Sequence, residues 1–573
     1  MPVEGTARQS ARAPGDLVDR LAELADSAPD TVLYIELMDG VHESARLTAA
    51  QLRDRAAALA ATLGERGLTP GDVALLMATP PCEFLVALFG CMWAGVIAAP
   101  VGYPRRAEHV QSRLAIVRDD AGAAAIVAAP PQGDAEAAVL PLMTRDILPV
   151  ILTTDEPAGP TGPPASERDI AYLQYTSGST RDPKGVILTH ANLVANLEVC
   201  RELMDMTPES VNVSWCPLTH DMGLIMGALP SIHLGMTSVL MPPSAFIRRP
   251  VTWMQAIATY RGTHGYSPNF GYDLCVDRTT EEIRAGLDLS SARVLINGAE
   301  PVRRRTRDRF LEAFAISGLA PQAHAPAYGL AESSVLVSVT PPDTAGQVFW
   351  VDGAALERDQ IVFCEPGTAN ARELCGDGVV GSGYDVRIVD PITGKELPPG
   401  QVGELWIAGP SVCPGYWRRP DATEEAFGGR LPDTEARYLR TGDLAFIQDG
   451  EIVVCGRKKD VVVIHGRNLY PQDIEFAVEV AHEAVHLGGS AAFSVEADGE
   501  ESLVVVAEVV GEPDEDEVLA AIRSSILAEF ELRVHDILLV APYTIPKTSS
   551  GKKQRTATRE LWREARGDEP VLV

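Results

Sequence analysis

The chain has 573 residues, 46% of them hydrophobic, and carries a formal net charge of -30 at pH 7. This length provides for a large buried core and exceeds one compact unit, so we expect at least two domains. The acidic balance argues against nucleic acid and anionic membrane surfaces as partners. It still allows a bound nucleotide, because a local cradle and a metal ion outweigh distant charges that are screened within about 10 Å.

The cysteines and the apolar stretches predict reduced thiols and no membrane span. The nine cysteines form no C-x-x-C pair, which gives no indication of zinc or of a disulfide framework and favours a cytoplasmic location. Residues 1–16 carry charge and lack the apolar core of a secretory signal. The uncharged stretch 84–102 is nearly long enough to span a membrane, but Gly95 and Pro100 interrupt it. We predict a buried helix, turn and strand there, and no membrane span.

Helical and extended patterns alternate through the first third of the chain. Helices are predicted at 17–25 and, rich in alanine, at 47–64. Strands are predicted for the short apolar segments 31–37, 73–77, 94–101, 125–128 and 150–153. This alternation predicts an α/β fold with a largely parallel sheet.

The segment 175–185, YTSGSTRDPKG, lies between predicted strands at 170–173 and 186–188. Its glycines can turn backbone N–H groups toward a ligand, and hydroxyls and a lysine complete a cradle for phosphate oxygens. The residues concerned are Thr176, Ser177, Gly178, Ser179, Thr180 and Lys184. A solvated hairpin turn is the alternative interpretation, and the Walker A pattern is absent.

Three later segments place polar side chains after predicted strands. His220, taken alone, is better explained as a hydrogen-bonded structural histidine than as a base. Asn297 precedes a glycine turn, where ligands often bind in open α/β sheets. Tyr328 and Glu332 would share a helix face, although Gly329 favours a loop and a plain capped helix is an alternative.

The last third of the chain has a different pattern of predicted elements. Short strands separated by turns predict a small β-subdomain at about 381–455. The basic segment 456–460 is a plausible hinge into a last domain of about one hundred residues. The cationic loop 545–555, which contains Lys552, would by itself be interpreted as a solvated tail.

Taken together, the motifs 175–185, 217–223, 297–300, 328–332, 438–443, 456–460 and 546–555 occur in the order found in adenylate-forming enzymes. Over nearly its whole length the sequence resembles this superfamily of acyl-CoA synthetases, nonribosomal peptide adenylation domains and luciferases. It is most similar to the fatty acyl-AMP ligases, on segments 218–224, 267–275, 297–302 and 467–475. The segment 341–377 resembles the insertion of that family.

The resemblance implies a large N-terminal domain, residues 1–458, of two α/β subdomains plus the small β-subdomain. A small mobile α+β C-terminal domain, residues 459–573, would follow and carry the catalytic Lys552, with Lys459 as the hinge. The segment 341–377 would be an insertion in the large domain.

The resemblance also implies a reaction. A carboxylate oxygen attacks the α-phosphorus of ATP and pyrophosphate leaves, which requires neutralised charge and good positioning. The phosphate cradle at 176–184 would hold the β- and γ-phosphates, and Glu332 with Thr180 would hold Mg²⁺. Lys552, Glu332 and His220 form the implied catalytic set. The nucleotide-contacting residues would be Asn297, Gly298, Ala299, Glu300, Tyr328, Gly329, Asp443 and Arg457.

The implied second substrate is the phosphopantetheine thiol of an acyl carrier protein, because the family's insertion hinders the coenzyme A reaction. The acyl chain is expected near Thr219, Met226, His264, Asn269 and Gly271. The ligase family usually carries tyrosine at 219 and glycine at 226, so Met226 and the His264 imidazole would shorten or polarise this pocket.

Two alternatives stay open. The first is a related enzyme for a small or aromatic acid, a nitrite-using diazotase-like enzyme or a coenzyme A-dependent ligase. The second, a catalytically inactive nucleotide-binding or carrier-docking protein, is disfavoured because Lys552, Glu332 and Asp443 are all present.

Overall fold

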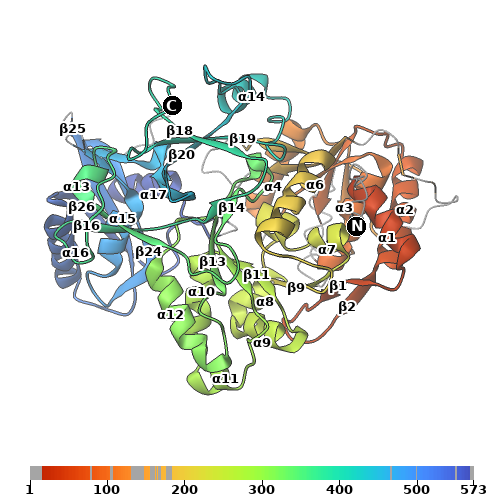
Figure 1. Ribbon diagram of the computed structural model, residues 1–573, viewed down its shortest axis with the longest axis horizontal. Coiled ribbons are helices and arrows are strands. Elements are labelled where there is room, and N and C mark those ends of the chain that lie inside the picture. Colours follow the sequence, from red (N-terminus) through yellow and green to blue (C-terminus); the bar gives the residue numbers. More distant parts are fainter. Residues whose placement is uncertain are drawn as a thin grey trace, which may run out of the picture.

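The computed structural model describes residues 16–77, 80–102, 107–130, 148–154, 162, 164–165, 169–175, 183–464, 467–497, 500–548 and 551–567. Figure 1 shows two sheets with covering helices in the N-terminal part, coloured red to green, and a smaller C-terminal unit in blue. The α/β class predicted from the sequence is confirmed.

A six-stranded sheet, ordered β6-β5-β3-β4-β7-β8, has at one edge the strands β7 and β8, which flank the predicted phosphate segment in the sequence. Strands β3 to β7 run parallel and β8 pairs antiparallel with β7. The bounds are β3 Val73–Met77, β4 Ile97–Pro100, β5 Ala125–Ala128, β6 Val150–Leu152, β7 Ile170–Tyr175 and β8 Gly185–Thr189.

A thirteen-stranded sheet, ordered β18-β19-β20-β21-β17-β14-β13-β12-β11-β9-β10-β1-β2, forms the centre of the molecule. Its middle is parallel, from β1 through β13, and β14 to β21 continue it antiparallel. The predicted β-subdomain therefore extends this sheet instead of forming one of its own. The bounds are β1 Val32–Glu36, β2 Ala45–Thr48, β9 Val211–Ser214, β10 Thr237–Leu240, β11 His264–Ser267, β12 Val294–Asn297, β13 His324–Tyr328, β14 Ser338–Val339, β17 Val379–Val380, β18 Asp385–Val389, β19 Gly403–Ala408, β20 Leu439–Gln448 and β21 Glu451–Arg457.

Helices cover these sheets. Their bounds are α1 Leu17–Ser27, α2 Ala49–Glu65, α3 Pro81–Ala94, α4 Ala107–Ala121, α6 His190–Leu203, α7 Pro230–Leu234, α8 Pro243–Arg248, α9 Val251–Tyr260, α10 Asn269–Asp277, α11 Glu281–Ala285, α12 Arg304–Phe314 and α14 Pro420–Phe427. Short helical turns are η1 Met222–Met226, η2 Ala315–Ser317, η3 Ala331–Ser333 and η4 Lys458–Asp460. The helix predicted from residue 47 begins at Ala49, because Thr48 ends β2 and caps the helix by accepting from the Gln51 amide at 3.3 Å.

The uncharged stretch at 84–102 is a buried helix, turn and strand, as predicted. Helix α3 is buried on nearly every face and ends at Gly95, whose φ of 71° suits a residue without a side chain. Strand β4 follows directly. Among the described residues, no helix combines the length and apolar character that a bilayer crossing requires.

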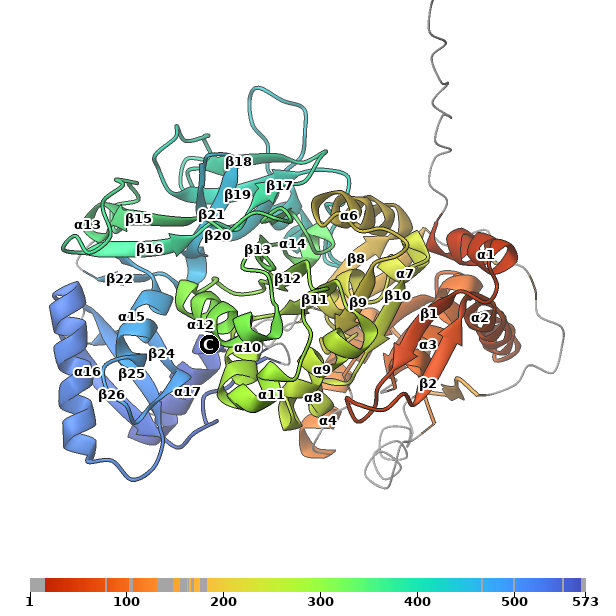
Figure 2. The same cartoon turned by 60° about the horizontal axis from the view of Figure 1, so that its bottom comes forward.

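The insertion 341–377 forms a two-stranded sheet with one short helix: β15 Val348–Asp352, α13 Gly353–Leu356 and β16 Ala371–Cys375. Figure 2 shows β15 and β16 lying between the central sheet and the C-terminal unit. The insertion therefore lies beside both parts of the molecule.

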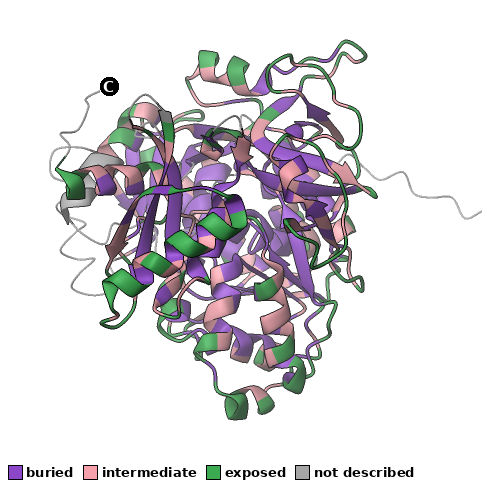
Figure 3. Ribbon diagram, turned by 90° about the vertical axis from the view of Figure 1, so that its left-hand side faces the viewer, coloured by how far each residue is buried: buried purple, intermediate pink, exposed green. Residues whose placement is uncertain are grey.

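The C-terminal unit has its own apolar core, drawn from residues 462–537. Buried strands face inward and α16 exposes its outer side (Figure 3). Helix α17 was missed by the sequence analysis, which ended with a loop at 555. The elements are β22 Val462–Ile464, β23 Arg467–Leu469, α15 Pro471–Glu479, β24 Val485–Ala497, β25 Glu500–Val509, α16 Glu515–Phe530, β26 Val534–Val540 and α17 Arg555–Arg566.

Candidate active site

A cavity of about 1500 Å³ lies where the two large sheets meet the C-terminal unit. Most of the predicted site residues that the structure describes line it: Lys184, Thr219, His220, Met226, Gly298, Ala299, Glu300, Tyr328, Gly329, Glu332, Asp443, Arg457, Lys459 and Lys552. Residues 176–182, which include Thr176, Ser177, Gly178, Ser179 and Thr180, lie outside the described part of the chain.

Asp443 is held by two neighbours on the central sheet. The Tyr328 hydroxyl at the end of β13 donates to Oδ2 at 2.7 Å, and Arg457 Nε donates to Oδ1 at 2.8 Å. Arg457 lies directly across the β20–β21 pair from Asp443. Burial and the Asp443 charge raise the pKa of Tyr328 far above its ordinary value, so its hydroxyl remains a donor. This arrangement presents a fixed carboxylate to hydroxyl-bearing ligands.

Glu332 and Lys184 are joined by a residue that the sequence analysis did not single out. The Tyr416 hydroxyl donates to Glu332 Oε1 at 2.8 Å, and Lys184 Nζ lies 5.0 Å from the centre of the Tyr416 ring. The backbone at Tyr416 is fixed because its neighbours pair with β8: Ile187 N donates to Gly415 O and Trp417 N to Gly185 O. The sequence signal available for Tyr416 was an aromatic residue directly after a glycine, Gly415.

The loop after β12 is tightly built. Ala299 has a φ of 68°, a strained conformation for a residue with a side chain, and such strain clusters at ligand sites. A side-chain carbon on Gly329, on the facing loop, would lie 1.6 Å from Val335 O. Glycine is thus required there because the backbone at 329 passes close to Val335 further along the same segment.

Asn297 and Asn269 support this loop from behind. Asn297 is fully buried, does not line the cavity, and donates to Asn269 Oδ1 at 2.9 Å. Asn269 in turn accepts from Arg303 N at 3.1 Å and donates to Pro301 O at 2.9 Å. Both side chains, expected to contact ligands, instead fix the backbone of 297–303.

His220 is paired with Asp221 at the cavity wall, with 2.7 Å between Nδ1 and Oδ1. Burial alone would raise the pKa of Asp221, but the charges of His220 and Lys552 hold it below its ordinary value. Lys552 lies in the cavity opposite them. Its enclosure and the nearby Arg457 cation lower the pKa of Lys552, partly offset by Asp221, Asp443 and Glu300. An anion that enters the cavity would stabilise the charged form of Lys552 and raise its pKa.

The expected acyl residues divide into two groups. Thr219 and Met226 line the cavity with apolar neighbours, among them Met222 and Leu336. His264 does not: its ring is 1% exposed, Nε2 lies 3.0 Å from Met204 O, and burial lowers its pKa to about 4.

Gly271, like His264, is absent from the cavity wall. A side-chain carbon there would lie 2.1 Å from Ser267 Oγ and 2.8 Å from Trp215, so glycine permits helix α10 to pack against the aromatic core. These two residues, together with Asn269, therefore support the pocket from outside it.

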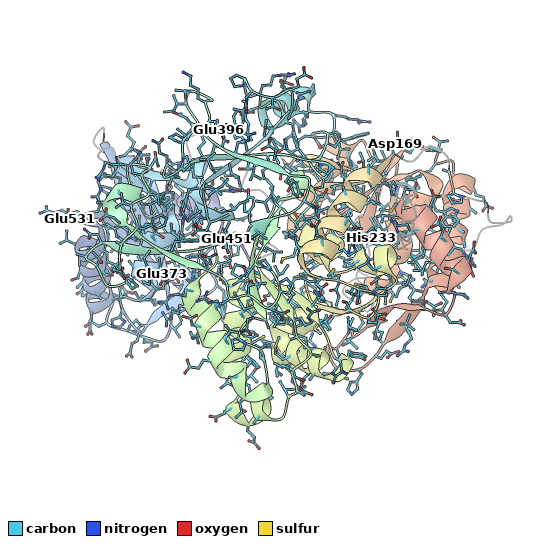
Figure 4. The ribbon with its side chains drawn as sticks, viewed as in Figure 1. Asp169, His233, Glu373, Glu396, Glu451 and Glu531 are labelled. Carbon is cyan, nitrogen blue, oxygen red and sulfur yellow. The ribbon has the colours of Figure 1, made fainter. Side chains whose placement is uncertain are left out.

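No cluster of three metal-ligating side chains occurs among the residues described. Glu332 and Lys184 both line the cavity. In Figure 4, Glu451 lies near the middle of the molecule and Glu531 at the left-hand edge, on the C-terminal unit.

Comparison with known proteins agrees with this geometry. The family model described as AMP-binding enzyme matches residues 21–417, and one described as Disco-interacting protein 2-like, AMP domain, matches 459–568. A medium-chain-fatty-acid–[acyl-carrier-protein] ligase, JamA of Moorena producens, is 39% identical over 94% of this chain and 93% of its own. The long-chain-fatty-acid–AMP ligase FadD26 of Mycobacterium tuberculosis is 36% identical over 95% and 96%.

A third relative and a solved structure are also similar to this chain. The 4-hydroxyphenylalkanoate adenylyltransferase of M. tuberculosis is 36% identical over 98% of this chain and 94% of its own. The fatty acyl-adenylate ligase of L. pneumophila, solved with acyl adenylate and pyrophosphate, superposes with a TM-score of 0.76 at 33% identity, covering 97% of each chain. The chain therefore belongs to the AMP-binding, adenylate-forming enzyme family and is similar to its fatty acyl-AMP ligases.

Proposed function

We propose that this protein activates a fatty acid with ATP to give an acyl-adenylate and pyrophosphate, and then transfers the acyl group to the phosphopantetheine thiol of an acyl carrier protein. One observation carries the proposal: a single cavity is lined by Asp443, Glu332, Lys184 and Lys552, with Tyr416 in contact with Glu332 and Lys184. The four lining residues are far apart in the sequence and supply the charges that phosphoryl transfer requires.

In the first step the acid's carboxylate oxygen forms a bond to the α-phosphorus, and the bond to the pyrophosphate oxygen breaks. Asp443 accepts hydrogen bonds from the ribose hydroxyls, while Tyr328 and Arg457 fix the orientation of its carboxylate. Gly298 and Ala299 border the adenine. Lys552 donates to the attacking carboxylate and the α-phosphate as negative charge concentrates there.

Glu332 fits a magnesium site, because a partly exposed carboxylate with one oxygen oriented by Tyr416 offers the hard donor that Mg²⁺ prefers. Thr180 is proposed as a second ligand, and the phosphates would complete the shell. The ion, when bound, neutralises phosphate charge. Lys184 adds a cation beside the same phosphates.

In the second step the thiol sulfur attacks the acyl carbon, AMP leaves, and a thioester results. We propose residues 1–458 and 459–573 as the two working domains, with a hinge at Lys459. The similarity to a medium-chain-fatty-acid–[acyl-carrier-protein] ligase supports a carrier protein as acceptor. The segment 341–377 contacts the C-terminal domain in two places. Glu357 accepts both Nε and Nη2 of Arg467 at 2.7 and 2.8 Å, so the insertion is bound to the start of the C-terminal domain.

A second pair binds the insertion to the far side of the C-terminal domain. Arg372 Nη2 donates to Glu529 O at 3.0 Å, and its guanidinium lies 4.6 Å from the centre of the Phe530 ring. We further propose the cytoplasm as the compartment, on the nine free thiols of the chain.

The test is pyrophosphate release across a panel of fatty, short and aromatic acids, each with coenzyme A, with a holo carrier protein, or with neither. We expect release with fatty acids and thioester formation with the carrier. Strong turnover with coenzyme A, or pyrophosphate release with nitrite alone, would refute the proposal.

A second candidate substrate is an aromatic acid. It is favoured by the similarity to the 4-hydroxyphenylalkanoate adenylyltransferase and by the pocket position of Met226, since methionine packs well against rings. Greater pyrophosphate release with arylalkanoic acids than with fatty acids would select it.

A further inference from the structure

Two glutamates of α15 lie almost entirely out of water: Glu475 is 1% exposed and Glu479 is 3% exposed. Glu475 accepts from Arg555 Nε at 2.7 Å and from Lys553 Nζ at 3.0 Å. Glu479 Oε1 accepts from Lys553 Nζ at 3.0 Å and from Ser490 Oγ at 2.9 Å. All these partners belong to the C-terminal domain, where they form a rigid frame around Lys553.

This frame fixes the segment that carries Lys552. The described residues on either side of 549–550 pair as the two arms of a hairpin: Thr548 N donates to Lys552 O at 2.8 Å, and Gln554 N donates to Pro546 O at 2.9 Å. The Lys552 amide donates to Thr548 Oγ1 at 3.0 Å. Because Lys553 is the next residue in the same closed hairpin, anchoring it to the two glutamates also anchors Lys552.

The second oxygen of Glu479 reaches across to the large domain. Arg303 Nη1 donates to Glu479 Oε2 at 3.1 Å, and the Arg303 side chain is 28% exposed. Arg303 directly precedes α12, and Figure 2 shows α12 beside α15. Its backbone is held by Asn269 and continues the loop whose residues Gly298 and Ala299 line the cavity.

The two oxygens of Glu479 thus have different partners. Oε1 is satisfied inside the C-terminal domain and would keep its partners if that domain rotated. Oε2 would lose Arg303. Burial raises the pKa of Glu479, but Lys553 and Arg303 together hold it at about 2. Removing one partner of an isolated buried ion pair is strongly destabilising, whereas a carboxylate with a second cation tolerates the loss better. The Arg303–Glu479 ion pair can therefore open at moderate cost.

We propose that Arg303 is a positioning residue for the adenylation step: its ion pair with Glu479 holds the C-terminal domain so that Lys553 places Lys552 in the cavity, and this pair opens for the acyl-transfer step. The proposal rests on the proposed function. It assigns to α12 a role in choosing between the two half-reactions.

The experiment measures the half-reactions separately in Arg303→Gln. Adenylation is followed by exchange of labelled pyrophosphate into ATP, with the acid that wild type uses best. Transfer is followed from a synthetic acyl-adenylate to a holo carrier protein. We expect the exchange rate to fall about tenfold or more, because a small displacement of a catalytic group is costly. Transfer should be unchanged or faster, and Arg303→Lys should retain most of the exchange.

Matched variants separate positioning from general damage. Arg309→Gln, on the same helix, removes an arginine of similar exposure, 29%, whose partners Asp273 and Asp277 both lie in the large domain. It should leave both half-reactions at wild-type rates. Glu479→Gln should slow exchange at least as much as Arg303→Gln, because it also weakens the anchor of Lys553, and the double variant should be no slower than Glu479→Gln alone. Equal losses in both half-reactions, or no loss in exchange, would overturn the proposal.

A measurement without substrate keeps the inference independent of the reaction. Amide hydrogen exchange in the hairpin 546–554 should be faster in Arg303→Gln than in wild type and Arg309→Gln, at equal melting temperature. Unchanged hairpin exchange would refute the positioning role even if the proposed reaction is correct. If amide exchange in the hairpin is faster in Arg303→Gln but the protein adenylates no acid, only the proposed function is refuted.

Discussion

The two halves of the cavity are built differently. The large-domain half takes Tyr328, Asp443 and Arg457 from three strands of one sheet, and hydrogen bonds of 2.7 and 2.8 Å join Asp443 to the other two. The C-terminal half contributes Lys552 on a hairpin. The Arg303–Glu479 ion pair, which we propose can open, is one of the contacts between this part and the large domain. Under the proposed function, this difference predicts that nucleotide binding is preorganised, whereas the position of the C-terminal domain decides where Lys552 lies.

The strand-built half also shows that residue type alone does not make a site. Asp385 accepts from Tyr438 at 2.6 Å and from Arg387 at 2.7 Å, a second Tyr–Asp–Arg group in the same sheet. It lies outside the cavity wall, and its side chain is 42% exposed, against 7% for Asp443. Position at the cavity distinguishes the two groups, and the second serves as a control for the first.

The largest effect should come from the hairpin. Lys552→Ala should raise the barrier to adenylation by roughly 3–4 kcal/mol, a loss of about 10²–10³-fold, because one preorganised donor to the developing charge disappears. Pyrophosphate exchange measures it, and nucleotide affinity should change little. Lys395→Ala, at an exposed turn, is the control. Undiminished exchange would remove Lys552 from the mechanism.

A change in the strand-built half should act on binding. Asp443→Asn should raise KM for ATP by about 10- to 100-fold, since hydrogen bonds to a charged group contribute roughly 1.5–3 kcal/mol. The KM for the acid should stay constant. Steady-state kinetics at varied ATP decide this, with Asp385→Asn as the matched variant. If both aspartate variants behave alike, the comparison between the two groups fails.

The hairpin can also be disturbed through its backbone. Gly551 has a φ of 85°, and a side-chain carbon there would lie 2.4 Å from a carbon of the Phe270 ring. Gly551→Ala should therefore push the hairpin away and slow adenylation by about tenfold, at a strain of about 1–2 kcal/mol. Gly567→Ala, also at positive φ but in open space, is the control. Equal rates in the two variants would contradict the close docking.

A smaller effect is expected from Tyr416→Phe, which removes the hydroxyl that orients Glu332. We expect the magnesium concentration for half-maximal exchange to rise about 3- to 10-fold, as one net hydrogen bond is worth about 1 kcal/mol. Titration of adenylation with magnesium measures this, and calorimetric binding of MgATP checks it without turnover. An unchanged magnesium requirement would show that Glu332 needs no such support.

The smallest effect is a shift with pH. The pKa of Lys552 is lowered in the nucleotide-free cavity, so its charge is lost at lower pH than for an ordinary lysine, and kcat/KM for ATP should fall first on the alkaline side. Bound phosphates raise that pKa, so kcat at saturating ATP should fall at higher pH. Lys552→Arg, which remains charged, should lack this limb. Coincident limbs in the two profiles would argue against the assignment.

The motifs and their order were sufficient to identify the family and the α/β class, and most of the site residues predicted from them that the structure describes line the cavity. The hydroxyl-rich segment before Lys184 and the Asp443 and Lys552 motifs have few alternative explanations when they occur together. Sequence reasoning was less successful where a side chain's direction matters. His264 and Gly271 lie near the pocket along the chain, but His264 binds Met204 O and Gly271 packs on Trp215.

The sequence by itself determined the periodicity of the elements, the glycine turns and the chemistry available at each motif, because these depend on local sterics and side-chain type. The tertiary structure alone decided that Tyr416 joins Glu332 to Lys184 and that Arg303 meets Glu479, 176 residues away. Such pairings depend on how separate elements pack in space. A local pattern contains no information about a partner that only the folded chain brings within 3 Å or so.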